Sequence, residues 1–215
     1  MRRSTLLGIC ISMGIAATSV AWLGSGNEPA GSLGWNSAPA SLRDVLWPEP
    51  REIGEFELVT QHGRPFTRDS FAGQWNFVFF GYLDCPDICP MSLGTMRQMR
   101  RLLIDRGHEK DFARFILVSV DSENDDPERM GSYLLQFDSE FVGLTGEKEM
   151  VDRLAESLAV HYRQVPDSDF NAIDHTSSLM IIDPQGRAVG ALQPPLVPEQ
   201  MADKFHRLAG AFPDY

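Results

Sequence analysis

A continuous apolar run followed directly by two cysteines constrains the fold more than any other feature. Residues 75–82 contain no charged side chain, and their number suits a buried central strand. Cys85 and Cys89 follow this run, and Met91 begins a series of apolar residues with helical spacing. We therefore expect both cysteines in a loop between a buried strand and a helix. There, backbone N–H groups and the positive end of the helix dipole favour thiolate over thiol.

Strand-like and helix-like segments alternate along the rest of the chain. The order is β-α-β-α followed by a hairpin and a helix, which predicts an α/β fold with a mixed sheet and helices on both faces. A thioredoxin-like arrangement is the best-known case with a cysteine pair after the first long buried strand. The expected strands are 56–60, 65–67, 75–82, 115–120, 141–144, 179–182 and 188–192, and the expected helices are 91–107, 127–137, 150–158 and 198–211.

The first 50 residues differ in composition from the rest. Arg2 and Arg3 precede an uncharged segment, so residues 1–23 are expected to form a transmembrane anchor or a signal segment, with the remainder beyond the membrane. Whether this segment is cleaved stays open. Residues 24–50, rich in Gly, Ser, Ala and Pro, are expected to form a flexible tether before a folded domain at 51–215. A bacterial inner membrane, with the domain facing the periplasm or the cell exterior, is the simplest location.

The charge of the chain argues against one class of partner. The formal net charge is −11 and no basic cluster interrupts it, whereas binding to nucleic acid requires a basic face that neutralises phosphates. We therefore expect no nucleic-acid partner.

Cys85 and Cys89 support two kinds of chemistry. A thiolate pair carries out two-electron redox reactions or binds a soft metal. If the segment is helical, both sulfurs face the same side and can reach one ion or each other. A bridge that only stabilises the fold is disfavoured, because closing so short a loop removes little entropy from the unfolded chain.

His175 is the strongest candidate for a third ligand among the five histidines. It lies between Asp174 and Thr176 in a segment that enters the strand at 179–182, and in a thioredoxin-like fold this segment lies next to the cysteine loop. The residues alone leave a structural role for His175 equally open. Two sulfurs and one nitrogen suit Cu(I) or zinc, and the lack of a fourth candidate favours copper, because structural zinc takes four protein ligands.

Three methionines follow the cysteine loop and could form a copper-trafficking stripe. Met91, Met96 and Met99 have the spacing of one helix face, which favours a role in the hydrophobic core.

The cysteine segment resembles the signature of a known family. Residues 80–90 read Phe-Gly-Tyr-Leu-Asp-Cys-Pro-Asp-Ile-Cys-Pro, similar to the Sco/SenC/PrrC family of membrane-tethered copper proteins. Blocks at 118–121, 143–146 and 174–186 match the family in the same order, within a similarity that spans about 54–208.

The resemblance implies a thioredoxin-like fold, in which Cys85, Cys89 and His175 bind copper as Cu(I) or Cu(II). It also implies a role in assembling the dinuclear copper centre of cytochrome c oxidase. One loop departs from the family pattern: the usual DPxxDTP is replaced by Asp-Ser-Glu-Asn-Asp-Asp-Pro at 121–127. Contacts to partners through this loop are therefore not implied.

Two functional classes stay open. The first is a metallochaperone that binds one copper through Cys85, Cys89 and His175 and passes it to the copper-binding subunit of cytochrome c oxidase. Other copper chaperones and thioredoxin-like reductants are candidate partners. The second is an envelope thiol-disulfide oxidoreductase that uses Cys85 and Cys89 as a redox-active pair on cysteines of that subunit or of other exported proteins. We favour the chaperone, and His175 discriminates between the two, since only a metal site needs it.

Overall fold

The computed structural model describes residues 38–166 and 172–212, and its centre is the strand β4 (Trp75–Gly81). All seven residues of β4 are buried. This strand pairs in parallel with β5 (Ala113–Ser119) and antiparallel with β9 (Leu179–Ile182). A strand with neighbours on both edges and cover on both faces requires a continuous apolar sequence, which explains the run that precedes the cysteines.

The main sheet has eight strands in the order β1-β10-β9-β4-β5-β6-β2-β3. Strand β5 pairs in parallel with both β4 and β6, and the other neighbouring strands pair antiparallel. The sheet is therefore mixed, as predicted. The remaining strands are β1 (Leu46–Arg51), β2 (Glu57–Thr60), β3 (Pro65–Thr67), β6 (Val142–Thr145) and β10 (Ala188–Leu192).

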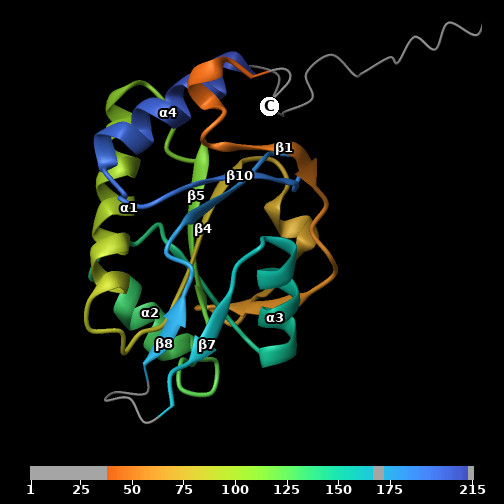
Figure 1. Ribbon diagram of the computed structural model, residues 1–215. Coiled ribbons are helices and arrows are strands. Elements are labelled where there is room, and N and C mark those ends of the chain that lie inside the picture. The colour runs from red at the N-terminus through yellow and green to blue at the C-terminus, as the bar shows by residue number, and fades with distance from the viewer. Residues whose placement is uncertain (1–37, 167–171, 213–215) are drawn as a thin grey trace, which may run out of the picture. The chain divides into compact units, whose positions relative to one another are not determined.

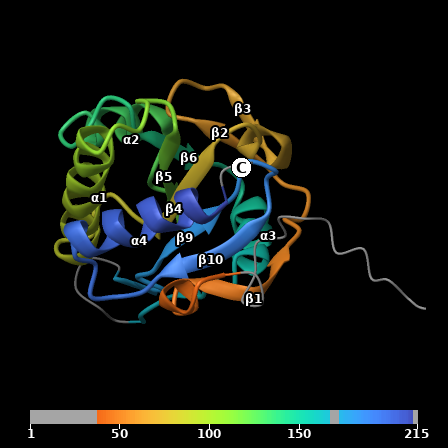
Figure 2. The same ribbon diagram turned by 90° about the horizontal axis from the view of Figure 1, so that it is seen from above.

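Helices cover both faces of this sheet. The α-helices of the described residues are α1 (Ile88–Asp105), α2 (Pro127–Leu134), α3 (Lys148–Ser157) and α4 (Pro198–Ala211). Helices α1 and α4 pack against each other on one face, and α3 lies on the other (Figures 1 and 2). The fold is the expected thioredoxin-like α/β arrangement.

A separate two-stranded ribbon lies beside the main sheet. It pairs β7 (Tyr162–Gln164) antiparallel with β8 (Ile173–His175), and Figure 1 shows it close to the start of α1. The ribbon therefore brings the last residue of β8 to the same end of the molecule as the cysteine loop.

The folded region begins before the boundary expected at residue 51. A 3-10 turn (Ala40–Leu42) and the strand β1 precede that boundary, and β1 pairs with β10. The side chains of Leu42, Val45 and Leu46 are buried. The prolines in this segment suggested a tether, but an edge strand also accepts proline because one side of it makes no ladder hydrogen bonds. The tether expected over 24–50 is thus wrong for its last ten or so residues, and its remainder lies outside the described residues.

The membrane segment expected at residues 1–23 also lies outside the described residues. Within the part of the chain that the structure describes, no helix combines the length and the apolar character needed to cross a membrane.

Candidate metal centre

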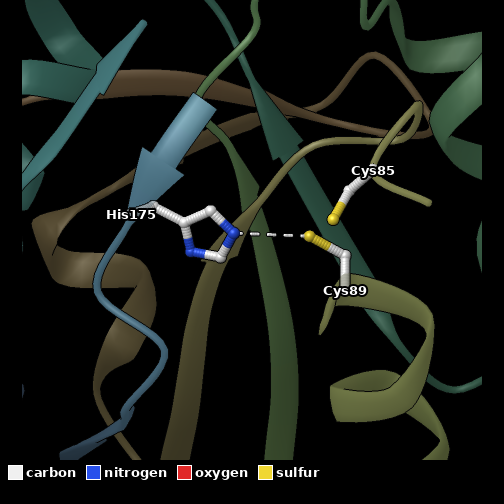
Figure 3. A group of neighbouring side chains, drawn as sticks. All are labelled: Cys85, Cys89 and His175. Carbon is white, nitrogen blue, oxygen red and sulfur yellow. Dashed lines mark hydrogen bonds between the residues drawn. The ribbon is translucent and has the colours of Figure 1, made fainter. Parts of the chain in front are cut away.

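The three predicted ligands lie together at one end of the sheet. Cys85 precedes α1, Cys89 is the second residue of α1, and His175 ends β8. Their ligand atoms all lie within 4.8 Å of one another, and Cys89 Sγ is 3.5 Å from His175 Nε2. Figure 3 shows both sulfurs and the imidazole directed toward a common point. Both cysteines are free thiols.

The cysteine loop is less helical than the spacing suggested. Helix α1 begins at Ile88, so Cys85 lies outside it, in a turn where its backbone N–H donates to the carbonyl of Tyr82 (3.4 Å). Pro90 falls in the first helical turn, where a missing N–H costs no intrahelical bond. The two sulfurs therefore meet through a turn and a helix start, not through two successive helical turns.

Gly81 leaves the space that the Cys89 sulfur occupies. A Cβ atom at Gly81 would lie 2.9 Å from Cys89 Sγ and 2.9 Å from the ring of Phe79. Atoms at that separation overlap, so the end of β4 requires glycine at this position.

The orientation of His175 leaves one ring nitrogen available to a metal. His175 Nδ1 lies 3.2 Å from the carbonyl oxygen of Thr176, and since a carbonyl only accepts, Nδ1 carries the proton and Nε2 its lone pair. The rings of Phe79 and Tyr82 contact the imidazole edge-on, with centroids 5.7 and 6.2 Å away. Tyr82 also ties the ribbon to β4, because its hydroxyl accepts a hydrogen bond from Ile173 N (3.3 Å).

Burial and nearby dipoles set the protonation of the three ligands. Burial lowers the pKa of His175, which favours the neutral imidazole that metals bind. Burial opposes ionisation of Cys85, but hydrogen bonds from the backbone N–H groups of Asp87 and Cys89 and from side chains outweigh it, so the pKa of Cys85 is lowered. Burial raises the pKa of Cys89 well above its ordinary value. Cys85 is therefore the more readily ionised thiol.

A shallow pocket lies next to the imidazole. It has a volume of about 300 Å³ and is lined by residues in or next to β7 and β8, including His161, Arg163 and His175. Cys85 is 8% exposed and Cys89 is fully buried. A partner molecule can thus approach the site from the side of His175, and Cys85 is the less buried of the two thiols.

Comparison with known proteins identifies the family of this chain. A model of the SCO1/SenC family matches residues 47–210. The chain belongs to the SCO1/SenC family.

Individual members of the SCO1/SenC family show how close the similarity is. The mitochondrial SCO1 homolog of Mus musculus is 35% identical over 136 residues, which cover 62% of this chain and 47% of that protein. The chain thus spans about half the length of that relative. The mitochondrial SCO2 homolog of the same organism is 30% identical over 193 residues, covering 84% of this chain and 75% of that protein. The copper-bound structure of ScoI from Bradyrhizobium japonicum is 35% identical with a TM-score of 0.63, covering 72% of this chain and 97% of that one.

The loop that departs from the family pattern lies directly against the cysteine loop. Asp125, within 121–127, is 1% exposed and accepts a hydrogen bond from Leu83 N. The sequence alone does not distinguish Asp125, because it is one of four acidic residues between 121 and 126. Its place in the loop that follows the buried strand β5 was the available signal.

The methionines that follow the cysteine loop and the other histidines were the remaining candidates. Met96 and Met99 are fully buried, as expected of core residues, but Met91 is 57% exposed, so the core prediction is wrong for Met91. Of the remaining histidines, His108 and His206 face each other, with 2.9 Å between His108 Nε2 and His206 Nδ1.

Proposed function

We propose that this protein binds one copper ion through Cys85, Cys89 and His175 and delivers it to the copper-binding subunit of cytochrome c oxidase. The observation that carries the proposal is the convergence of two thiol sulfurs and one imidazole nitrogen within 4.8 Å. Within residues 38–166 and 172–212, no fourth histidine, cysteine or carboxylate joins this group.

The donor set fits copper better than zinc. Two thiolates are soft ligands that select Cu(I), and a three-coordinate site with two sulfurs and one nitrogen is acceptable to that ion. A structural zinc site takes four protein ligands in a closed tetrahedron. The copper-bound ScoI structure from Bradyrhizobium japonicum supports the assignment.

The chain's own residues prepare the site for uptake and release. Cys85 offers a thiolate first, because its pKa is lowered. Cys89 is buried as a thiol, so its proton is released to solvent when the metal binds. His175 offers Nε2 without losing a proton. Because Cys85 and His175 lie on the accessible side, a partner's ligands can replace them before they replace Cys89.

We also propose the location that the sequence predicted. Residues 1–23 would hold the protein at a bacterial inner membrane, with the domain facing the periplasm or the cell exterior. The charge asymmetry around that segment, with Arg2 and Arg3 on its N-terminal side, supports this orientation.

A second function is favoured by the unequal thiols. A thiol-disulfide oxidoreductase needs an ionised attacking thiol and a nearby resolving thiol, and Cys85 and Cys89 have these properties. The Cys85 thiolate would attack a partner disulfide and release one partner cysteine as a thiolate. Cys89, losing its proton, would then attack the Cys85 sulfur and release the second. The partner gains two electrons, this chain acquires a Cys85–Cys89 disulfide, and a thioredoxin-like reductant restores it.

Anaerobic titration of the reduced protein with Cu(I) against a competing chelator tests the first function. We expect one copper per chain, loss of tight binding in Cys85→Ser or Cys89→Ser, and a clear loss of affinity in His175→Ala. His62→Ala, in the exposed turn between β2 and β3, is the control and should bind as the wild type does. A His175→Ala protein with wild-type copper affinity and oxidase assembly, beside an inactive Cys85→Ser protein, would contradict copper delivery and favour thiol exchange.

A further inference from the structure

Asp125 is a buried carboxylate that holds the loop carrying Cys85. Its Oδ2 accepts hydrogen bonds from Leu83 N (3.1 Å) and from Ser119 Oγ (2.7 Å). Leu83 lies two residues before Cys85, and Ser119 is the last residue of β5. The carboxylate thus fastens the cysteine loop to the end of the neighbouring parallel strand.

Arg129, on the first turns of α2, links the same two regions from the surface. Its Nη2 donates to Asp84 Oδ1 (2.9 Å), and its Nη1 lies 3.6 Å from Asp125 Oδ1. Asp84 directly precedes Cys85. The planar guanidinium can hold two carboxylates at once, which a lysine does less well. Arg129 therefore contacts the loop and also offsets the charge of the buried carboxylate.

The charge of Asp125 acts on Cys89. Burial does most to raise the pKa of Cys89, and Cys85 and the Asp125 carboxylate add to it. Burial raises the pKa of Asp125, while the hydrogen bonds from Ser119 and Leu83 and the charge of Arg129 favour its ionised form. Because Asp125 is 1% exposed, water screens the charge of that form less than it screens a surface carboxylate. Asp125 Oδ1 has no hydrogen-bond partner, which leaves Arg129 as the cation closest to it among the ion pairs of the described residues.

We propose that Asp125 and Arg129 are positioning residues of the metal centre that set the preference of the site between Cu(II) and Cu(I). This inference rests on the proposed function, because it assumes that copper occupies the site formed by Cys85, Cys89 and His175. A nearby negative charge stabilises the more positive ion, Cu(II), and a nearby positive charge does the opposite. Asp125 therefore favours Cu(II), and Arg129 moderates that preference.

The two residues have opposite charges, which separates an electrostatic role from a merely structural one. Asp125→Asn keeps the size of the side chain and an oxygen for Leu83 N, but removes the charge. Arg129→Gln removes the cation and leaves the carboxylate unbalanced. A structural role alone would loosen the loop in both variants and weaken both oxidation states in the same way.

The experiment measures dissociation constants for Cu(I) and Cu(II) in the purified full chain, each against a chelator of known affinity. The ratio of the Cu(II) constant to the Cu(I) constant should rise about tenfold in Asp125→Asn and fall severalfold in Arg129→Gln, as expected for a single charge near a partly buried site. The double variant should return toward the wild-type ratio. Arg153→Gln, which removes the exposed ion pair with Glu149 on α3, is the control and should leave the ratio unchanged.

A second readout needs no copper. Hydrogen exchange at the Leu83 amide of the reduced, metal-free protein should be faster in Asp125→Asn than in the wild type, because the weaker acceptor leaves this N–H less protected. Arg153→Gln should show wild-type exchange there.

Shifts of the ratio in the same direction for both single variants, or no shift in either, would overturn the inference. If Asp125→Asn does not fold, the direction of the Arg129→Gln shift alone decides. A wild-type protein that binds no copper would instead refute the proposed function.

Discussion

Cys85 and Cys89 have the same side chain but different environments. Cys85 is slightly exposed and has a lowered pKa, whereas Cys89 is fully buried and has a raised pKa. The difference arises because the backbone N–H groups at the start of α1 face Cys85, while Cys89 is enclosed between α1 and the end of β4. Cys85 is thus suited to meet an incoming ion or disulfide, and Cys89 is suited to retain the ion.

At this scale the sequence was enough to propose the three candidate ligands, but not the groups that support them. A cysteine pair after a buried strand, with a histidine at a later strand, is visible as a pattern. Asp125 is distinguished from the acidic residues beside it only by tertiary contacts, namely its bonds to Leu83 and Ser119. Gly81 likewise reveals its role only through the sulfur that lies against it.

Gly81→Ala tests the close approach of β4 to the candidate metal centre. The added Cβ would overlap Cys89 Sγ and Phe79, so we expect weaker copper binding and a loss of roughly 1–3 kcal/mol in the free energy of unfolding. Copper titration and urea denaturation measure the two effects.

Gly94→Ala, in α1, is the matched control for this change. Nothing lies within 4 Å of a Cβ at Gly94, so this variant should bind copper normally and gain roughly 0.5–1 kcal/mol of stability. Normal copper binding in Gly81→Ala would show that Cys89 is free to move and that position 81 does not require glycine.

At the scale of elements, strands with continuous apolar sequences were located well, and β1 was missed. β4, β5 and β9 are buried apolar runs, and their positions agree with the prediction to within one or two residues. β1 contains Pro48 and Pro50, and its sequence has no alternation that distinguishes an edge strand from a tether. Its place was decided by pairing with β10, where Gly190 allows the backbone near Val45 to approach closely.

Truncation tests whether this first segment belongs to the domain. A chain that starts at Ala38 retains Leu42, Val45 and Leu46, whereas one that starts at Glu52 loses all three from the core. At roughly 1.5–3 kcal/mol for each buried side chain, the shorter chain should lose on the order of 5 kcal/mol, comparable to the whole stability of many domains. Urea denaturation of both chains measures this, and equal stabilities would show that the segment adds little.

At the scale of the whole molecule, the long helix α1 lies between the candidate metal centre and a pair of histidines, His108 and His206. Its 18 residues span about 27 Å, with Cys89 at its start and His108 shortly after its end. There, His108 bonds to His206 of α4 and stacks on Phe112, with ring centroids 4.5 Å apart. This pair joins the loop after α1 to α4, far along the helix from the metal site.

The pair predicts a pH dependence of folding stability. Burial lowers the pKa of His108, and the charges of His206 and Arg106 add to this effect. Below its ordinary value of 6.5, the unfolded chain therefore binds more protons at this residue than the folded chain does. The resulting stability is fully present above pH 6.5 and is lost as the pH falls through that value.

Urea denaturation of the metal-free protein between pH 7.5 and 5.5 measures this effect. The decrease in the free energy of unfolding should be smaller in His108→Gln than in the wild type. His62→Gln, in the exposed turn between β2 and β3, should retain the wild-type decrease. His175 remains in all three proteins, so its own contribution cancels. An equal decrease in His108→Gln and the wild type would rule out the pair as its source.

The site draws its sulfurs and its nitrogen from positions that are far apart in the chain. Cys89 and His175 are separated by 86 residues, and they meet only after the main sheet and the ribbon have formed. An unfolded chain offers an ion the two cysteines alone, so full affinity appears only with folding. If the proposed location is right, a chain that crosses the membrane unfolded gains its full affinity for copper only after it has folded on the far side.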